Sequence, residues 1–165
     1  MTPSQLAKSN TERGHQTAFF AFCAVTHLHG FDAAYQWDAE GDRYLSTLTY
    51  SVGIHQPRVP ALKWIHAIHN QGHGDVIRGA AAKAEGLRAG VADVFLPYPV
   101  GMWHGLYLEM KRPEHKPKRN GTSKGHLSQK QFEFSEYVLK VGYGWCVCYG
   151  WREAAAMVRS YIEWR

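Results

Sequence analysis

Apolar residues at helical spacing predict three helices, over residues 12–29, 128–141 and 152–164. Ser9 and Glu12 stand three positions apart, which predicts a capping box with Ser9 as the N-cap residue, and Gly30 ends this first helix. Ser128 and Gln131 repeat the same pattern at the start of the second helix. The segment before the first helix is predicted to be a frayed tail.

The centre of the chain predicts short strands, over residues 64–69, 91–97, 105–111 and 143–149. A glycine-rich turn at residues 70–75 precedes a further helix over residues 76–87. Residues 31–63 are interpreted as an insertion, in which residues 44–51 predict a strand or hairpin edge. The order of elements predicts an α/β fold with a small mixed sheet flanked by helices.

The length of 165 residues, of which 45% are hydrophobic, predicts one folded domain over residues 1–165. No apolar run reaches the ~18 residues that cross a membrane, and the polar N-terminus lacks the apolar core of a signal peptide. We therefore expect a cytoplasmic protein that has no membrane partner.

Three cysteines, Cys23, Cys146 and Cys148, stand in apolar surroundings without a CxxC pair. Buried free thiols are the favoured interpretation, and a metal or redox role is the alternative. Ten histidines also invite a zinc interpretation, but no H-E-x-x-H frame is present.

The net charge of +5 favours a polyanionic partner such as DNA. Basic residues crowd the stretch after the third predicted strand, and with Arg88 they are the expected DNA contacts: Arg88, Arg112, Lys116, Lys118, Arg119, Lys124 and Lys130. A solvated loop is the alternative interpretation of such a charged run.

Two carboxylates in apolar strands carry the candidate chemistry. Side chains alternate along a strand, so Glu109 and Lys111 share one face, and a hairpin brings Asp93 next to Glu109. The two carboxylates repel each other unless a proton or a cation intervenes. Magnesium suits such a site, with the backbone carbonyl of Met110 as a further ligand.

This arrangement predicts hydrolysis of a phosphodiester that leaves a 5′-phosphate. A bound cation polarises the phosphoryl oxygen and lowers the pKa of a bound water, and Lys111 stabilises the charge that grows on phosphorus. The plainer alternative is an exposed strand end with a local ion pair between Glu109 and Lys111.

The chain resembles the VRR-NUC domain, the virus-type replication-repair branch of the PD-(D/E)XK nuclease superfamily, and in particular its stand-alone phage and bacterial members. The motifs that carry the resemblance are Glu12, Gln16, residues 85–93, residues 105–112 and residues 127–131. The resemblance covers about residues 9–30 and 64–164. Ala92 departs from it, because the superfamily pattern has proline before the first acid.

The resemblance implies a restriction-endonuclease-like core, dependence on Mg²⁺ or Mn²⁺, and a homodimer that cuts branched DNA such as Holliday junctions or flaps. It makes Asp93, Glu109 and Lys111 the catalytic core. It adds Glu12 as a further metal-binding acid and Gln131 as a catalytic residue on the helix after the core. Glu12 and Gln131 can also serve as capping residues of their own helices.

Three functions stay open at this point. The first is a metal-dependent nuclease for branched DNA, and the second is a restriction-type nuclease that uses residues 31–63 for recognition. The third is a DNA-binding protein without catalytic activity, against which the intact trio of Asp93, Glu109 and Lys111 speaks.

Overall fold

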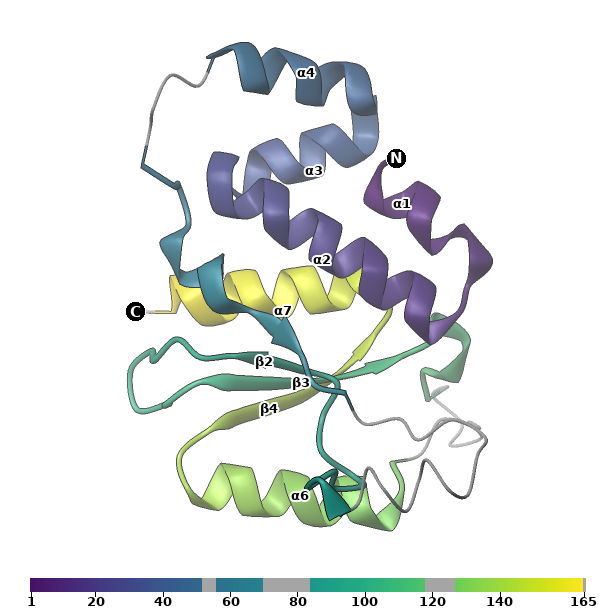
Figure 1. Cartoon of the computed structure of the whole chain (residues 1–165), viewed down its shortest axis with the longest axis vertical. Helices are drawn as coiled ribbons and strands as arrows, with labels where there is room; N and C mark the ends of the chain where they lie inside the picture. Colours follow the sequence, from purple (N-terminus) through teal and green to yellow (C-terminus); the bar gives the residue numbers. More distant parts are fainter. Residues whose placement is uncertain (52–55, 70–83, 118–126, 165) are drawn as a thin grey trace.

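The computed structural model describes residues 1–51, 56–69, 84–117 and 127–164. A four-stranded sheet lies between helices (Figure 1). The long helices are α2 (Glu12–His29), α3 (Phe31–Glu40), α4 (Asp42–Ser51), α6 (Gln129–Lys140) and α7 (Trp151–Glu163). The strands are β1 (His66–Ala67), β2 (Val94–Leu96), β3 (Leu106–Lys111) and β4 (Gly144–Tyr149). The predicted α/β fold with a small mixed sheet is confirmed.

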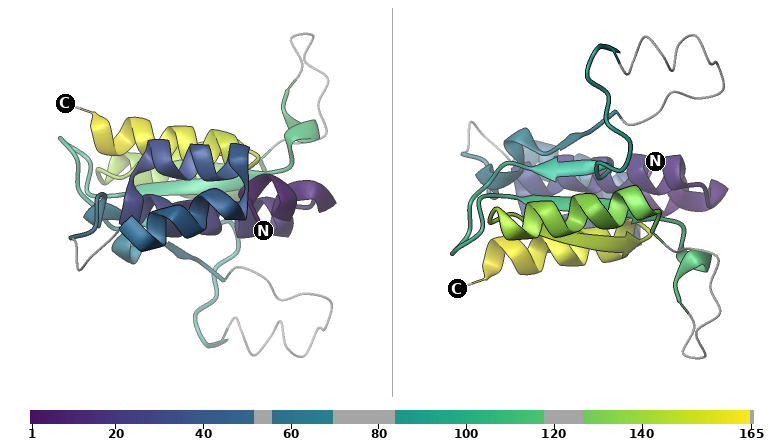
Figure 2. Two further views of the ribbon diagram at one scale, coloured as in Figure 1. Left: turned by 90° about the horizontal axis from the view of Figure 1, so that it is seen from above. Right: turned by 90° about the horizontal axis from the view of Figure 1, so that it is seen from below.

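The sheet has the order β1-β2-β3-β4. β1, β2 and β3 pair antiparallel, so the predicted hairpin of the two central strands is confirmed. β3 and β4 pair in parallel, with α6 between them in the chain. Parallel neighbours need such a crossover, which places α6 against one face of the sheet. The view from below shows α6 in front of the strands (Figure 2).

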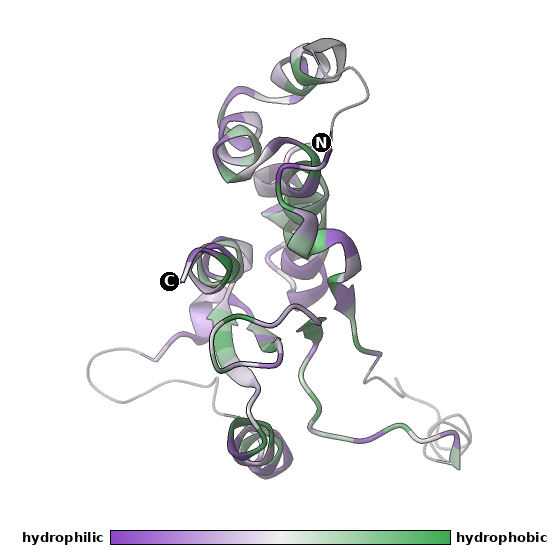
Figure 3. Cartoon of the chain, turned by 90° about the vertical axis from the view of Figure 1, so that its left-hand side faces the viewer, coloured by the Kyte–Doolittle hydropathy of each residue, from purple (hydrophilic) through white to green (hydrophobic). Residues whose placement is uncertain are grey.

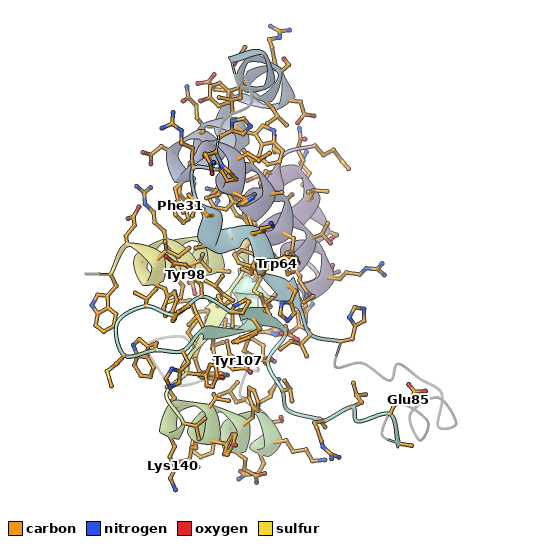
Figure 4. The ribbon with its side chains drawn as sticks, turned by 60° about the vertical axis from the view of Figure 1, so that its left-hand side comes forward. Phe31, Trp64, Glu85, Tyr98, Tyr107 and Lys140 are labelled. Carbon is orange, nitrogen blue, oxygen red and sulfur yellow. The ribbon has the colours of Figure 1, made fainter. Side chains whose placement is uncertain are left out.

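Alternation along the strands separates two faces. Val94, Leu108 and Met110 lie in one hydrophobic core with Phe19 of α2 and Trp151 of α7. Hydrophobic segments lie on the strands where these helices cover them (Figure 3). The other face turns toward α6, and Tyr107 lies on that side in Figure 4. A half-buried face of this kind can carry polar chemistry, because α6 covers it only in part.

The N-terminus is folded, so the predicted frayed tail is wrong. A short helix α1 (Pro3–Leu6) begins with Thr2, which forms a complete capping box with Gln5. Ser4 then donates to Asp38 of α3 through its backbone N–H at 2.6 Å and through its hydroxyl at 2.8 Å. These hydrogen bonds offset the entropy lost on ordering the segment.

The predicted cap of α2 is also wrong. Thr11, rather than Ser9, is the N-cap residue, and its side chain accepts a hydrogen bond from the backbone N–H of Gly14 at 3.0 Å. Ser9 lies in a 3₁₀ turn that ends at Asn10 in the left-handed conformation. Two neighbouring hydroxyl residues make local spacing ambiguous, and the geometry of the preceding turn decides which one caps the helix.

Residues 31–51 form helices rather than the strand or hairpin edge predicted for residues 44–51. α3 buries Phe31, Ala34 and Trp37, which recur every three residues and pack toward α2. The indole N–H of Trp37 donates to Asp42 at the start of α4 at 3.1 Å. Trp64, at the start of the strand predicted over residues 64–69, instead ends a 3₁₀ helix (Pro60–Trp64) and is 69% exposed.

The predicted turn at residues 70–75 and most of the helix over residues 76–87 lie outside the described residues. Within the described part, none of the helices combines the length and the apolar character that crossing a membrane requires.

Candidate active site

The pairing of β2 with β3 brings the two acids together. Val94 lies opposite Leu108 and Phe95 opposite Tyr107. One step further along the same register sets Asp93 against Glu109, on the face that turns toward α6. The backbone N–H of Met110 donates to Asp93 Oδ2 at 2.8 Å, which fixes the Asp93 carboxylate against β3.

Glu109 is the most deeply buried acid of the site, with only 2% of its surface exposed. Lys111 Nζ donates to Glu109 Oε1 at 2.8 Å, and Gln131 Nε2 donates to the same oxygen. Among the described residues, the other oxygen, Glu109 Oε2, has no hydrogen-bond partner although it is buried. A buried carboxylate oxygen without a hydrogen bond destabilises the fold unless a ligand or a proton binds to that oxygen.

Gln131 joins the first turn of α6 to Glu109. Its Oε1 accepts from the backbone N–H of Ser128 at 2.9 Å, while its Nε2 donates to Glu109. The Ser128 side chain accepts from the backbone N–H of Gln131 at 3.3 Å, so the predicted capping box is confirmed. Opposite ends of the Gln131 amide group therefore cap α6 and contact Glu109, and a catalytic role for Gln131 stays a prediction.

Burial disfavours the charged form of both acids. Burial and then the negative charge of Asp93 raise the pKa of Glu109 from 4.5 to about 7, against the lowering effect of Lys111. Burial also raises the pKa of Asp93, while the hydrogen bond from Met110 and the charge of Lys111 lower it. Among the described residues, the ammonium of Lys111 can balance only one of the two carboxylate charges of the site.

Lys111 responds to the same surroundings in the opposite direction. Burial by itself lowers the pKa of Lys111, but the hydrogen bond and charge of Glu109, followed by the charges of Glu12 and Asp93, outweigh it and raise the pKa. Lys111 is therefore a fixed positive charge at neutral pH, suited to stabilising an anion rather than to accepting a proton.

Glu12 occupies the first turn of α2 and is exposed. Its charge contributes to raising the pKa of Asp93 and of Glu109, so it lies within electrostatic range of both. Glu12 was expected to take part in a capping box, but Thr11 caps the helix instead. The Glu12 carboxylate in the first turn interacts favourably with the helix dipole. Its role as a metal ligand stays a prediction.

The carboxylates fit a hard cation that takes the rest of its ligands from elsewhere. No three His, Cys, Asp or Glu side chains cluster as a metal site within the ranges that the structure describes. Magnesium does not require such a cluster, since it usually binds through one or two carboxylates, waters and substrate phosphate. The unpartnered Oε2 of Glu109 and the adjacent Asp93 match this pattern. The role of the Met110 carbonyl stays a prediction.

The predicted DNA contacts separate into three groups. Arg88 and Lys130 line a common pocket beside α6. Arg112 and Lys116 form ion pairs, with Glu114 at 3.2 Å and with Glu153 at 2.5 Å respectively. The remaining three lie outside the described residues: Lys118, Arg119 and Lys124.

Sequence reasoning missed an aromatic cluster on the same face as the acids. Phe95 and Tyr107 stack with ring centroids 4.4 Å apart, and Phe134 of α6 meets Tyr107 edge-on at 5.2 Å. The alternation that placed Asp93 beside Phe95 and Glu109 beside Tyr107 was a signal for it. The acids therefore lie at one end of an aromatic surface.

Comparison with known proteins adds a structural likeness. No family model matches the chain, and no curated protein matches it. Among solved structures, the chain is similar to a "VRR_NUC domain protein", with 22% sequence identity and a TM-score of 0.48 over 74% of this chain and 87% of that chain. The name is that of the family which the sequence motifs resemble.

Proposed function

We propose that the protein is a metal-dependent endodeoxyribonuclease that hydrolyses phosphodiester bonds. The observation that carries this proposal is the convergence of Asp93, Glu109 and Lys111 on one face, with one buried oxygen of Glu109 left without a partner among the described residues. A structural ion pair needs one acid for one base. Here a second acid adds charge that only a proton or a cation can offset.

Asp93 and Glu109 would hold Mg²⁺ or Mn²⁺, with Glu12 and the Met110 carbonyl as further candidates. A bound divalent ion supplies Lewis acidity toward the phosphoryl oxygen and lowers the pKa of a bound water. The protein's own residues provide the rest of the chemistry. Lys111 places a permanent positive charge where negative charge grows during displacement at phosphorus.

Gln131 positions Glu109. Because Ser128 engages the oxygen end of the Gln131 amide, the nitrogen end is directed at Glu109 Oε1. With Lys111 on the same oxygen, Glu109 Oε1 is fixed by two donors and Oε2 stays available for a ligand. Groups that orient a ligand in this manner tune metal affinity and rate by about 10- to 100-fold.

DNA is the proposed substrate because the chain carries a net charge of +5. Branched DNA and a homodimer remain part of the proposal. The alternative of a restriction-type enzyme gains no support, because α3 and α4 lie on the side of the sheet opposite to α6 and the site (Figures 1 and 2). A purely DNA-binding protein has no use for the excess buried negative charge of the site.

The test compares cleavage of supercoiled plasmid, a labelled four-way junction and a labelled flap, each with magnesium and with a chelator. Asp93→Asn and Glu109→Gln are expected to abolish cleavage while DNA binding persists, because they remove a ligand charge without changing shape. Glu136→Gln, an exposed acid on α6, is the matched control and keeps full activity. Wild-type cleavage in chelator, or full activity of either site variant, contradicts the proposal.

A further inference from the structure

A pocket of about 620 Å³ lies between residues 87–91 and α6. Its volume falls in the range of ~300–1,000 Å³ typical of small-ligand sites. Two aromatic residues of α6, Phe134 and Tyr137, form part of its lining together with two cations, Arg88 and Lys130. The chain leads away from the sheet toward Glu85 (Figure 4).

One ring contact and two chain connections join the pocket to the proposed active site. Lys130 is adjacent in the chain to Gln131, which donates to Glu109. Phe134 packs edge-on against Tyr107, which precedes Glu109 on the same face of β3. On the opposite wall, Val91 stands two residues before Asp93. The residues that line the pocket are therefore joined directly to the segments that carry Asp93 and Glu109.

The position of the wall is fixed by Gly90. Its φ is +93°, and a Cβ atom there would lie 2.5 Å from the backbone carbonyl carbon and oxygen of Lys130. Only glycine allows the chain to pass so close to the first turn of α6 in that conformation. The pocket thus depends on a close backbone contact rather than on side chains alone.

The lining combines ring faces with positive charge. Tyr137 is 64% exposed, which is a large aromatic surface to leave in water without a ligand. Arg88 and Lys130 enter no ion pair within the part of the chain that the structure describes. Glu133, the acid of the lining, accepts a hydrogen bond from Gln129 Nε2 at 3.1 Å. Two cations against one acid favour an anionic ligand that also has a planar apolar part.

We propose that this pocket binds an unpaired nucleobase of the DNA substrate, with Arg88 and Lys130 at the adjoining phosphates. The inference rests on the proposed nuclease function and specifies its substrate. Bases stack on aromatic side chains whatever their identity, because every base has a π face. A base inside a duplex is already stacked on both sides, so the pocket selects DNA in which a nucleotide near the cut lies outside the helix.

The test measures binding in chelator, where no cleavage occurs. Fluorescence anisotropy gives the affinity for a duplex and for the same duplex with one unpaired 2-aminopurine. The wild type is expected to prefer the second DNA and to quench 2-aminopurine emission through stacking. Tyr137→Ala is expected to lower that preference by about 5- to 100-fold, the worth of one stacked base. Tyr137→Phe keeps the ring and retains the preference.

Phe132→Ala is the matched control, because Phe132 is an aromatic residue of the same helix that is 48% exposed and does not line the pocket. It is expected to leave preference and quenching unchanged. Equal wild-type affinity for the two DNAs, absent quenching, or equal losses in Tyr137→Ala and Phe132→Ala overturns the inference.

Cleavage with magnesium, measured separately, distinguishes this failure from failure of the proposed function. If no DNA is cut but the preference depends on Tyr137, the nuclease proposal fails and the base pocket stands. If DNA is cut but Tyr137→Ala leaves the preference unchanged, the base pocket fails and the nuclease proposal stands.

Discussion

The raised pKa of Glu109 makes a quantitative prediction for Glu109→Gln. Folding moves this pKa from 4.5 to about 7, so between those pH values the folded protein holds a proton that the unfolded chain has released. The free energy of unfolding of the wild type therefore falls as pH rises through this window. Glutamine has nearly the same shape and cannot ionise, so the variant lacks this fall.

The difference between the two pKa values corresponds to about 3 kcal/mol, at about 1.4 kcal/mol for each pH unit. The stability of Glu109→Gln relative to wild type is thus expected to rise by roughly that amount between pH 4 and pH 8, and then to level off. A glutamine oxygen can still accept from Lys111, and any loss in that bond adds an offset that does not vary over this range. The change with pH, rather than the absolute stability, is the quantity to measure.

Urea unfolding at a series of pH values, in chelator, gives this quantity from tryptophan fluorescence, since Trp151 is buried and reports the folded core. Glu133→Gln, which replaces an exposed acid on α6, is measured alongside as the control for removing a carboxylate. A difference for Glu109→Gln that is flat with pH, or one that falls as pH rises, would refute the account in which burial and Asp93 raise the pKa of Glu109.

The remaining predictions concern the cation, the amide and the pocket wall. Saturating magnesium at pH 8 should raise the melting temperature of the wild type, by the equivalent of about 3 kcal/mol at a hundredfold excess over Kd, and an equal rise in Asp93→Asn would exclude this site. At magnesium concentrations below saturation, the cleavage rate should increase from pH 6 to pH 8, because Glu109 must lose its proton before it can hold the cation, and a pH-independent rate under these conditions would contradict the assignment. Gln131→Ala should slow cleavage by about 10- to 100-fold, whereas Gln129→Ala, two residues earlier in α6, should not. Gly90→Ala should lower the melting temperature more than Gly86→Ala, because both glycines have positive φ but only Gly90 meets another backbone; equal losses would mean that strain alone matters.

Several features of the site were predictable from sequence because they depend on local periodicity. Alternation along a strand sets Glu109 and Lys111 on one face whatever the rest of the chain does. A short hairpin then leaves few registers that keep Val94 and Leu108 in the core, which is why the position of Asp93 opposite Glu109 could be anticipated. The capping box at Ser128 is equally local, since it involves neighbours within one turn.

Residues whose structure depends on distant partners were predicted wrongly. The N-terminal segment is ordered because Ser4 meets Asp38, which is 34 positions away in sequence. Residues 44–51 have the composition of a strand, but they form α4, which packs on α3 and places Tyr44 and Leu45 against the core (Figure 1). Tertiary contacts override weak local preference in both cases.

The sequence by itself determined which side chains of a strand share a face and that a capping box at Ser128 begins α6, because those properties follow from backbone geometry over a few residues. Only the tertiary structure decided that Gln131 reaches Glu109, that one oxygen of Glu109 is buried without a partner among the described residues, and that residues 87–91 and α6 border an open pocket. Burial and long-range contact set these features, and neither burial nor contact is a property of a short stretch of chain.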